Sequence, residues 1–281
     1  MAEKHSLSQF FVIAFALPIV ATTVVVLVAG APSALVVNEI SVPALVVVTA
    51  MVFAPTIAAI IVVFRSQRFA GIGNLFRQLK YWKFELQWYL NAILIFPVTI
   101  LAVLFVLSWF SSSFTPVLAL SGMAFAALLS TLFEEIGWTG LATPLMLERM
   151  SPLKVGLSLG SLHAAWHLAA NLYGAGAFHG DLFFVNFLAT AVGIVGLRIV
   201  TIWIYVRTNS LVLGWLTHLG FTGGQLSFVS FALTSGETIV WNTAFSVVVT
   251  GIVVFIVARN KDLTGNNNLR RPVVRSDQVA E

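Results

Sequence analysis

Residues 117–147 read VLALSGMAFAALLSTLFEEIGWTGLATPLML and place two adjacent carboxylates, Glu134 and Glu135, inside a long apolar run. No other charged residue occurs between Val117 and Leu147. A carboxylate at membrane depth costs free energy and is rare there unless it has a function. The plain alternative is a solvated helix end. The apolar pattern continues on both sides of the pair, so we favour a functional site inside the membrane.

The composition of the whole chain indicates an integral membrane protein. Of its 281 residues, 59% are hydrophobic and 9% are charged, whereas soluble domains carry about 25% charged residues. No hydrophilic stretch is long enough for a separate soluble domain. The absence of cysteine excludes disulfides, thiolate catalysis and cysteine-ligated metals. The net charge of +4 comes from basic residues in short loops, which favours a role in membrane topology and not nucleic-acid binding.

Hydropathy predicts several membrane spans, each of which needs about 20 apolar residues. A basic amphipathic stretch at residues 65–85 is expected on the membrane surface. The expected fold is all-α, a polytopic membrane domain of about eight transmembrane helices over residues 1–258, followed by a disordered basic tail at 259–281. The expected spans are residues 9–29, 43–64, 86–109, 117–147, 154–173, 182–206, 209–231 and 238–258.

The distribution of Lys and Arg supports eight spans. Four loops that eight spans would place on one side contain no Lys or Arg, and every basic residue except Arg198 falls in the opposite loops or the termini. By the positive-inside rule, both termini are expected in the cytoplasm. The loops without basic residues are 30–42, 110–116, 174–181 and 232–237.

Polar residues on three of the expected spans lie at similar depths. At about 1.5 Å of rise per residue, Glu134 and His167 lie roughly 20 Å from the cytoplasmic ends of their spans, and His218 roughly 13–14 Å. These three side chains can therefore meet inside the membrane. His163 lies four residues before His167 and Thr222 four residues after His218, so each pair shares a helix face. A lone buried histidine is more often a core residue, but three on facing helices indicate a site.

The chemistry of this set suits the activation of water. Glu134 and Glu135 point about 100° apart on a helix, so we expect them to have different partners. A buried carboxylate can act as a general base near neutral pH, and a histidine and a hydroxyl can donate to an oxyanion. Two histidines and a glutamate also make a plausible zinc site, although the HExxH pattern is absent. The candidate metal ligands are His163, His167, His218 and Glu134.

The glutamate pair resembles a motif of the CPBP family, which comprises CAAX prenyl proteases and bacteriocin-processing or immunity proteins and is also called Abi. The first motif of that family is EExxxR. Residues 134–139 match it, with Thr139 in the place of the arginine. The motif-bearing core of the resemblance covers about residues 117–231.

Two histidine motifs of the same family follow in order. His167 matches the histidine of FxxxH, with His163 in the place of the phenylalanine. His218 matches the first residue of HxxxN, with Thr222 in the place of the asparagine. Three motifs in order, each on an expected span, make the resemblance specific.

The resemblance implies an intramembrane endopeptidase with a cytoplasm-facing cavity, which cleaves a membrane-bound or lipidated peptide in the plasma membrane of a prokaryote. It implies that Glu134 and His167 activate the water. His218 and Thr222 would then stabilise the oxyanion, and Glu135 would hold the site together. Members of the family are described both as metalloproteases and as glutamate-dependent enzymes, so a divalent metal such as zinc is a candidate cofactor.

Two other functions remain open from the sequence. A non-catalytic member could bind a peptide or a partner membrane protein, for instance in bacteriocin self-immunity. A transporter could use Glu134, Glu135 and Arg198 as an ion relay. Catalysis requires Glu134 and His167, whereas binding survives their loss and transport predicts ion flux.

Arg198 is the one charge within the expected span 182–206. We expect it to pair with Glu135 and to replace the charge that is missing at Thr139. The alternative is that its side chain snorkels toward the interface.

Overall fold

The structure of the protein is a computed structural model that describes residues 2–30, 42–119, 122–173 and 180–265. Every regular element within these residues is a helix, which confirms the expected all-α class. The main helices are α1 (Ala2–Ala29), α2 (Val42–Arg77), α3 (Leu86–Ser108), α4 (Gly122–Gly137), α5 (Thr143–Leu147), α6 (Pro152–Tyr173), α8 (Phe183–Thr208), α9 (Leu211–Phe228) and α10 (Ser235–Arg259).

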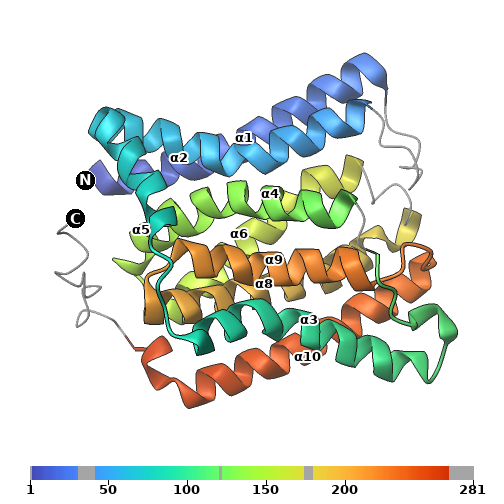
Figure 1. Ribbon diagram of the computed structural model, residues 1–281. Coiled ribbons are helices and arrows are strands. Elements are labelled where there is room, and N and C mark those ends of the chain that lie inside the picture. Colours follow the sequence, from blue (N-terminus) through green and yellow to red (C-terminus); the bar gives the residue numbers. More distant parts are fainter. Residues whose placement is uncertain (1, 31–41, 120–121, 174–179, 266–281) are drawn as a thin grey trace.

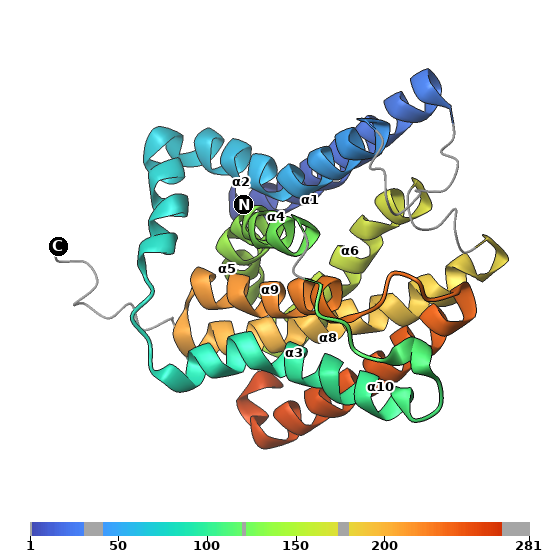
Figure 2. The same cartoon turned by 45° about the vertical axis from the view of Figure 1, so that its right-hand side comes forward.

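The helices are arranged in layers (Figures 1 and 2). α1 and α2 pack together on one side, α3 and α10 lie on the opposite side, and α4, α6, α8 and α9 lie between them. α2 packs on α4, α4 on α9, α9 on α3, and α6 on α8. The inner helices are the ones that carry the polar residues of the expected site, namely Glu134, Glu135, His163, His167, Arg198 and His218.

Five helical stretches in the described part of the chain are long and apolar enough to cross a membrane, so the protein is a polytopic membrane protein. α4, α6 and α9 are not among them, and these helices carry the site glutamates and histidines, which lower their hydropathy. The number of eight crossings therefore stays a prediction. The five stretches are Ser6–Ala29, Val42–Lys80, Leu86–Ser108, Gly180–Thr208 and Ser235–Arg259.

The basic stretch after the second expected span is helical for most of its length. α2 continues to Arg77, with a kink at Arg68, where φ is 55° and ψ is −144°. Beyond the kink α2 turns away from its first half (Figure 2). The short helix η1 (Gln78–Lys80) follows, and Gln78 Nε2 donates to the carbonyl oxygen of Gly140 at 3.1 Å. This bond ties the basic stretch to the segment that follows the glutamate pair.

The helix with the two glutamates begins later than expected. Val117 and Ala119 are not helical, and their N–H groups donate to the carbonyl oxygens of Phe228 at 3.1 Å and Ser227 at 2.9 Å at the end of α9. These contacts from α9 take the place of intrahelical hydrogen bonds. The expected span of 117–147 therefore loses its first residues, and the described helix starts at Gly122.

The prediction of a disordered tail from residue 259 is wrong for its first residues. A short helix, η5 (Lys261–Leu263), follows α10, and Leu263 is buried. Arg207 Nη2 donates to Asn260 Oδ1 and to Asp262 Oδ1, both at 2.9 Å. These contacts dock the first residues after α10 onto the end of α8. The rest of the expected tail, from residue 266, lies outside the described residues.

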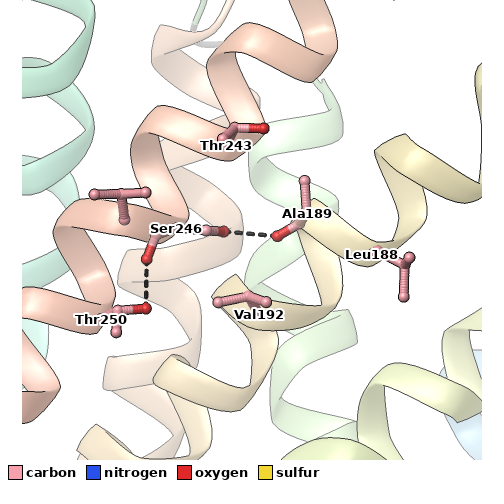
Figure 3. Close-up of a pocket in the computed structure, with 7 residues that line it drawn as sticks. Leu188, Ala189, Val192, Thr243, Ser246 and Thr250 are labelled. Atoms are coloured by element: carbon pink, nitrogen blue, oxygen red, sulfur yellow. Dashed lines mark hydrogen bonds between the residues drawn. The ribbon is translucent and has the colours of Figure 1, made fainter.

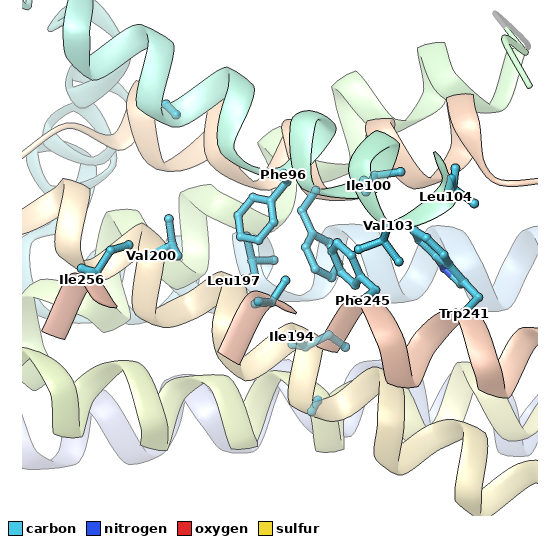
Figure 4. Packing of buried hydrophobic residues seen from close by; sticks show 14 of the residues in the cluster. Phe96, Ile100, Val103, Leu104, Ile194, Leu197, Val200, Trp241, Phe245 and Ile256 are labelled. Carbon is cyan, nitrogen blue, oxygen red and sulfur yellow. The ribbon is translucent and has the colours of Figure 1, made fainter. Parts of the chain in front are cut away.

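Two apolar clusters hold the bundle together. One joins α3, α8, α9 and α10 and includes Phe96, Leu197 and Phe245 (Figure 4). The other joins α1, α2, α6 and the segment after α4, and includes Trp138 and Trp166. The polar site lies next to both clusters. Arg198 directly follows Leu197 of the first cluster, and the ring of His163 contacts that of Trp138 in the second.

Candidate active site

The two adjacent glutamates of α4 have different partners, as their separation around the helix predicts. Glu134 contacts His163 of α6, with Oε2 3.2 Å from Nε2. Glu135 contacts Arg198 of α8 and His218 of α9. One helix therefore supplies carboxylates to two different groups of residues, and the four inner helices meet at this point.

Glu135 is the most connected residue of the site. Its Oε1 lies 2.6 Å from Arg198 Nη2, and its Oε2 accepts from Nη1 at 3.0 Å. Oε1 also lies 2.8 Å from His218 Nδ1, and Oε2 accepts a hydrogen bond from Thr139 Oγ1. A two-point pair of this kind is geometrically specific. The expected pairing of Arg198 with Glu135 is confirmed, and the snorkelling alternative is wrong because Arg198 is fully buried.

Arg198 has a second contact that the sequence did not reveal. Its Nε donates to Nδ1 of His163 at 2.9 Å. A nitrogen that accepts a hydrogen bond carries no proton, so a neutral His163 has its proton on Nε2. Nε2 is the atom that faces Glu134. His163 therefore donates to the Glu134 carboxylate.

The proton of His218 is assigned in the same way. Glu135 is paired with an arginine, so its carboxylate accepts hydrogen bonds and does not donate them. His218 must then donate from Nδ1, and its Nε2 is free of this contact. Thr222 lies one turn further along α9 and is half-buried. Its expected place beside an oxyanion stays a prediction.

His167 lies next to these residues on α6. Its ring centroid is 4.9 Å from that of His163 and 5.1 Å from that of Trp166. One ligand atom each of Glu134, His163 and His167 can be chosen so that all three lie within 4.8 Å of one another. The expected approach of His167 to Glu134 inside the bundle is thus observed.

The site is buried except at His167. Glu135, His163 and Arg198 are 0% exposed, Glu134 is 6% and His218 is 3% exposed, and His167 is half-buried. His167 is therefore the residue of this site that a water or a substrate can reach most readily. The fully buried residues are suited to holding Glu134 and His167 in place.

The local structure brings these side chains together through close helix contacts. On α6, a Cβ at Gly160 would lie 2.8 Å from Cα of Val195 and 3.3 Å from Cβ of Arg198. A larger residue would therefore separate α6 from α8 at the level of Arg198. Directly after the glutamates, η3 (Trp138–Ala142) is a turn of π-helix, a feature that is frequent at functional sites.

By spacing alone, Glu134, His163 and His167 could hold a metal ion. The hydrogen bonds of His163 oppose this arrangement, because Nδ1 accepts from Arg198 and Nε2 carries the proton. A metal ligand needs a free lone pair. The group does not fit a metal ion in its present hydrogen-bonding pattern.

A pocket in the described part of the chain does not correspond to the expected cytoplasm-facing cavity. That pocket is a groove of about 400 Å³ between α8 and α10, away from the glutamates (Figure 3). Ser246 Oγ donates to the carbonyl oxygen of Ala189 at 2.7 Å beside it. None of the site residues lines this groove, and the cavity stays a prediction.

The fold and the site together define a class: a polytopic all-helical membrane protein with glutamates, histidines and an arginine gathered inside its bundle. A family model described as "Type II CAAX prenyl endopeptidase Rce1-like" matches residues 113–223. This match supports the resemblance to the CPBP family of CAAX proteases that the sequence motifs predict. No curated protein matches the chain.

Proposed function

We propose that this protein is an intramembrane endopeptidase that hydrolyses a peptide bond in a membrane-bound or lipidated peptide. The observation that supports this most directly is the position of Glu134. Its carboxylate has an oxygen within 4.8 Å of a ring nitrogen of His167, while the adjacent Glu135 is neutralised by Arg198. The match to the Rce1-like endopeptidases supports the same chemistry.

The charge balance of the site suits a general base. Two carboxylates, Glu134 and Glu135, face one guanidinium, that of Arg198, and the neutral His163 adds no charge. One further proton makes this buried group electrically neutral. Glu134, whose partner is neutral, is the carboxylate that takes it. In the proposed step Glu134 and His167 hold a water, Glu134 removes its proton, and the hydroxide attacks the carbonyl carbon.

The oxyanion of the tetrahedral intermediate is then stabilised by hydrogen bonds from α9. Thr222 can donate from its hydroxyl. His218 can donate from Nε2 once its ring has taken up a second proton from solvent, which it returns to solvent when the product leaves, and Glu135 at Nδ1 favours that positive charge. Glu134 finally passes its proton to the departing amine nitrogen, which restores the carboxylate.

The mechanism has no step through a metal, because the nitrogen of His163 that faces Glu134 is occupied by a proton. A divalent cation such as zinc would act as a Lewis acid on the water or on the carbonyl oxygen. If His163 were one of its ligands, His163 would have to give up its hydrogen bond from Arg198. The metal-free mechanism keeps that bond.

The departure from the family motif at Thr139 does not argue against catalysis, because Arg198 brings the missing charge to Glu135 from another helix. The proposed setting is the plasma membrane of a prokaryote, with both termini in the cytoplasm. The proposed partners are the lipid bilayer and a membrane peptide, and no nucleic acid.

The test compares the membrane peptides of cells that produce the wild type, Glu134→Gln or His167→Ala. Both variants should cause the same peptides to accumulate uncleaved. Glu85→Gln is the matched control, because Glu85 is exposed at the start of α3. Identical peptide profiles in all four strains would reject the proposal. A phenotype such as bacteriocin immunity that persists in both variants would favour a binding function instead.

A further inference from the structure

We infer that His163 is a positioning residue, held by Arg198 so that its Nε2–H fixes the Glu134 carboxylate, and that it is not a metal ligand. This inference rests on the proposed function, because it assigns a role to His163 in orienting the general base. It also explains why two departures from the family pattern, His163 and Thr139, occur in one chain. Both are linked to the position of Arg198.

Arg198 uses all three of its guanidinium nitrogens within the site. Nη1 and Nη2 contact the two oxygens of Glu135, at 3.0 and 2.6 Å. Nε contacts Nδ1 of His163 at 2.9 Å. The planar guanidinium fixes the angle between these contacts, which a lysine ammonium cannot do. One side chain from α8 therefore sets the position of a carboxylate on α4 and of an imidazole on α6.

The hydrogen bond from Arg198 determines what His163 can offer to Glu134. With Nδ1 as acceptor, the neutral ring has a single donor, Nε2–H, and this donor lies 3.2 Å from Oε2 of Glu134. The other carboxylate oxygen, Oε1, is then left for the water. The hydrogen bonds from Arg198 to His163 and from His163 to Glu134 therefore fix one oxygen of the Glu134 carboxylate and leave the other to bind the water.

The surroundings of His163 keep its ring in one orientation. The ring is fully buried, and its centroid lies 5.4 Å from that of Trp138 and 5.6 Å from that of Trp166. Both tryptophans are fully packed in the second apolar cluster. A ring that cannot turn cannot exchange its two nitrogens, so the donor stays directed at Glu134.

The variants His163→Gln and His163→Phe separate the possible roles. A glutamine can accept from Arg198 with its oxygen and donate to Glu134 with its amide, but it is a poor metal ligand. A phenylalanine removes both hydrogen bonds. We expect His163→Phe to lower kcat by about 10–100-fold with a small change in KM, by analogy with the loss found when a partner that orients a metal-ligating side chain is removed. His163→Gln should recover most of that loss.

The activity assay uses the peptide that accumulates in Glu134→Gln membranes, with each variant purified and shown to be folded. Equal kcat in both variants and the wild type would overturn the positioning role. An equal loss in both, together with loss of bound zinc by elemental analysis, would assign His163 as a metal ligand. A loss of thermal stability with unchanged kcat for the folded fraction would make its role structural.

A second measurement does not depend on catalysis. Ring nitrogens of ¹⁵N-histidine-labelled protein in lipid nanodiscs report which nitrogen is protonated, and His163→Gln identifies the signal. The expected state of His163 is a protonated Nε2 and a bare Nδ1, unchanged by added zinc and altered by Arg198→Lys. A proton on Nδ1, or a shift on adding zinc, would overturn the inference. If the wild type cleaves no peptide, the proposed function fails. The spectrum would still show whether His163 accepts from Arg198 at Nδ1 and donates from Nε2.

Discussion

Arg198 of α8 and Glu135 of α4 form a fully buried two-point ion pair, with nitrogen–oxygen distances of 2.6 and 3.0 Å. The pair joins residues that are 63 positions apart in the chain. The family motif places its arginine four residues after the second glutamate, where this chain has Thr139. Here Thr139 donates to the same carboxylate, and the charge arrives from a different helix. The same electrostatic requirement is thus met by a different residue.

The variant Arg198→Leu should destabilise the protein strongly. It leaves the Glu135 carboxylate buried without its counter-charge, and breaking a buried pair in this way typically costs about 3–5 kcal/mol. Thermal unfolding in detergent measures the loss. Arg207→Leu is the matched control on the same helix, because its partly exposed pair with Asp262 should contribute no more than about 1 kcal/mol. Equal effects of the two substitutions would contradict the importance of the buried pair.

Adding Thr139→Arg to Arg198→Leu should restore part of the lost stability. The new arginine would return a positive charge to Glu135 from the position that the family motif uses. The fit is tight, because a Cβ at Gly214 would lie 2.9 Å from Cγ2 of Thr139, so we expect partial and not complete recovery. No recovery in the unfolding assay would show that the charge must come from α8.

It could be predicted from the sequence that the site residues of different helices meet, because helices have a regular rise and a regular angular spacing. Polar residues in apolar spans must face the bundle interior, so equal depth brought Glu134 and His167 together. Arg198, the lone charge of the expected span 182–206, was expected to pair with Glu135. Both predictions depend only on how far each residue lies along its helix, which can be read from the sequence.

The details that the sequence did not reveal depend on contacts between distant segments. The proton position in His163 follows from which atom of Arg198 it meets. The late start of α4 follows from backbone bonds between Val117 and Phe228. The ordered turn after α10 follows from Arg207, which reaches Asp262 from another helix. Hydropathy and spacing carry no information on such pairings.

Substitutions of His218 should separate the stability of the site from its chemistry. An asparagine can place an amide donor where Nδ1 now donates to Glu135 at 2.8 Å, but it has nothing in the place of Nε2. His218→Asn should therefore unfold close to the wild type and lose nearly all activity. His218→Ala loses the donor as well, and a missing hydrogen bond to a buried charged group costs about 1.5–3 kcal/mol. A stable and active His218→Asn variant would show that Nε2 takes no part in catalysis.

Helices α4 and α2 approach each other closely at Gly137, two residues after Glu135. A Cβ there would lie 2.5 Å from the backbone of Pro55 on α2, and Thr56 donates to the carbonyl oxygen of Phe133 beside it. Gly137→Ala should push α2 and α4 apart and cost about 1–3 kcal/mol by overpacking. Gly251→Ala on α10 is the control, because nothing lies within 4 Å of the new methyl group. It should be neutral or slightly stabilising in the same unfolding assay.

The number of membrane crossings can be measured directly, because the chain has no cysteine and single introduced cysteines can be labelled without background. Lys83, Ser112 and Arg149 are exposed, and the segment of α4, η3 and α5 lies between the last two. If this segment crosses the bilayer, a membrane-impermeant thiol reagent should label Ser112→Cys from the outside of intact cells and should not reach Arg149→Cys or Lys83→Cys. Eight crossings require this pattern and place both termini in the cytoplasm. If only the five most apolar stretches cross, Ser112→Cys and Arg149→Cys should both be labelled from the outside. That result would place the glutamate helix in a different topology and would remove the basis for a cytoplasmic entrance to the site.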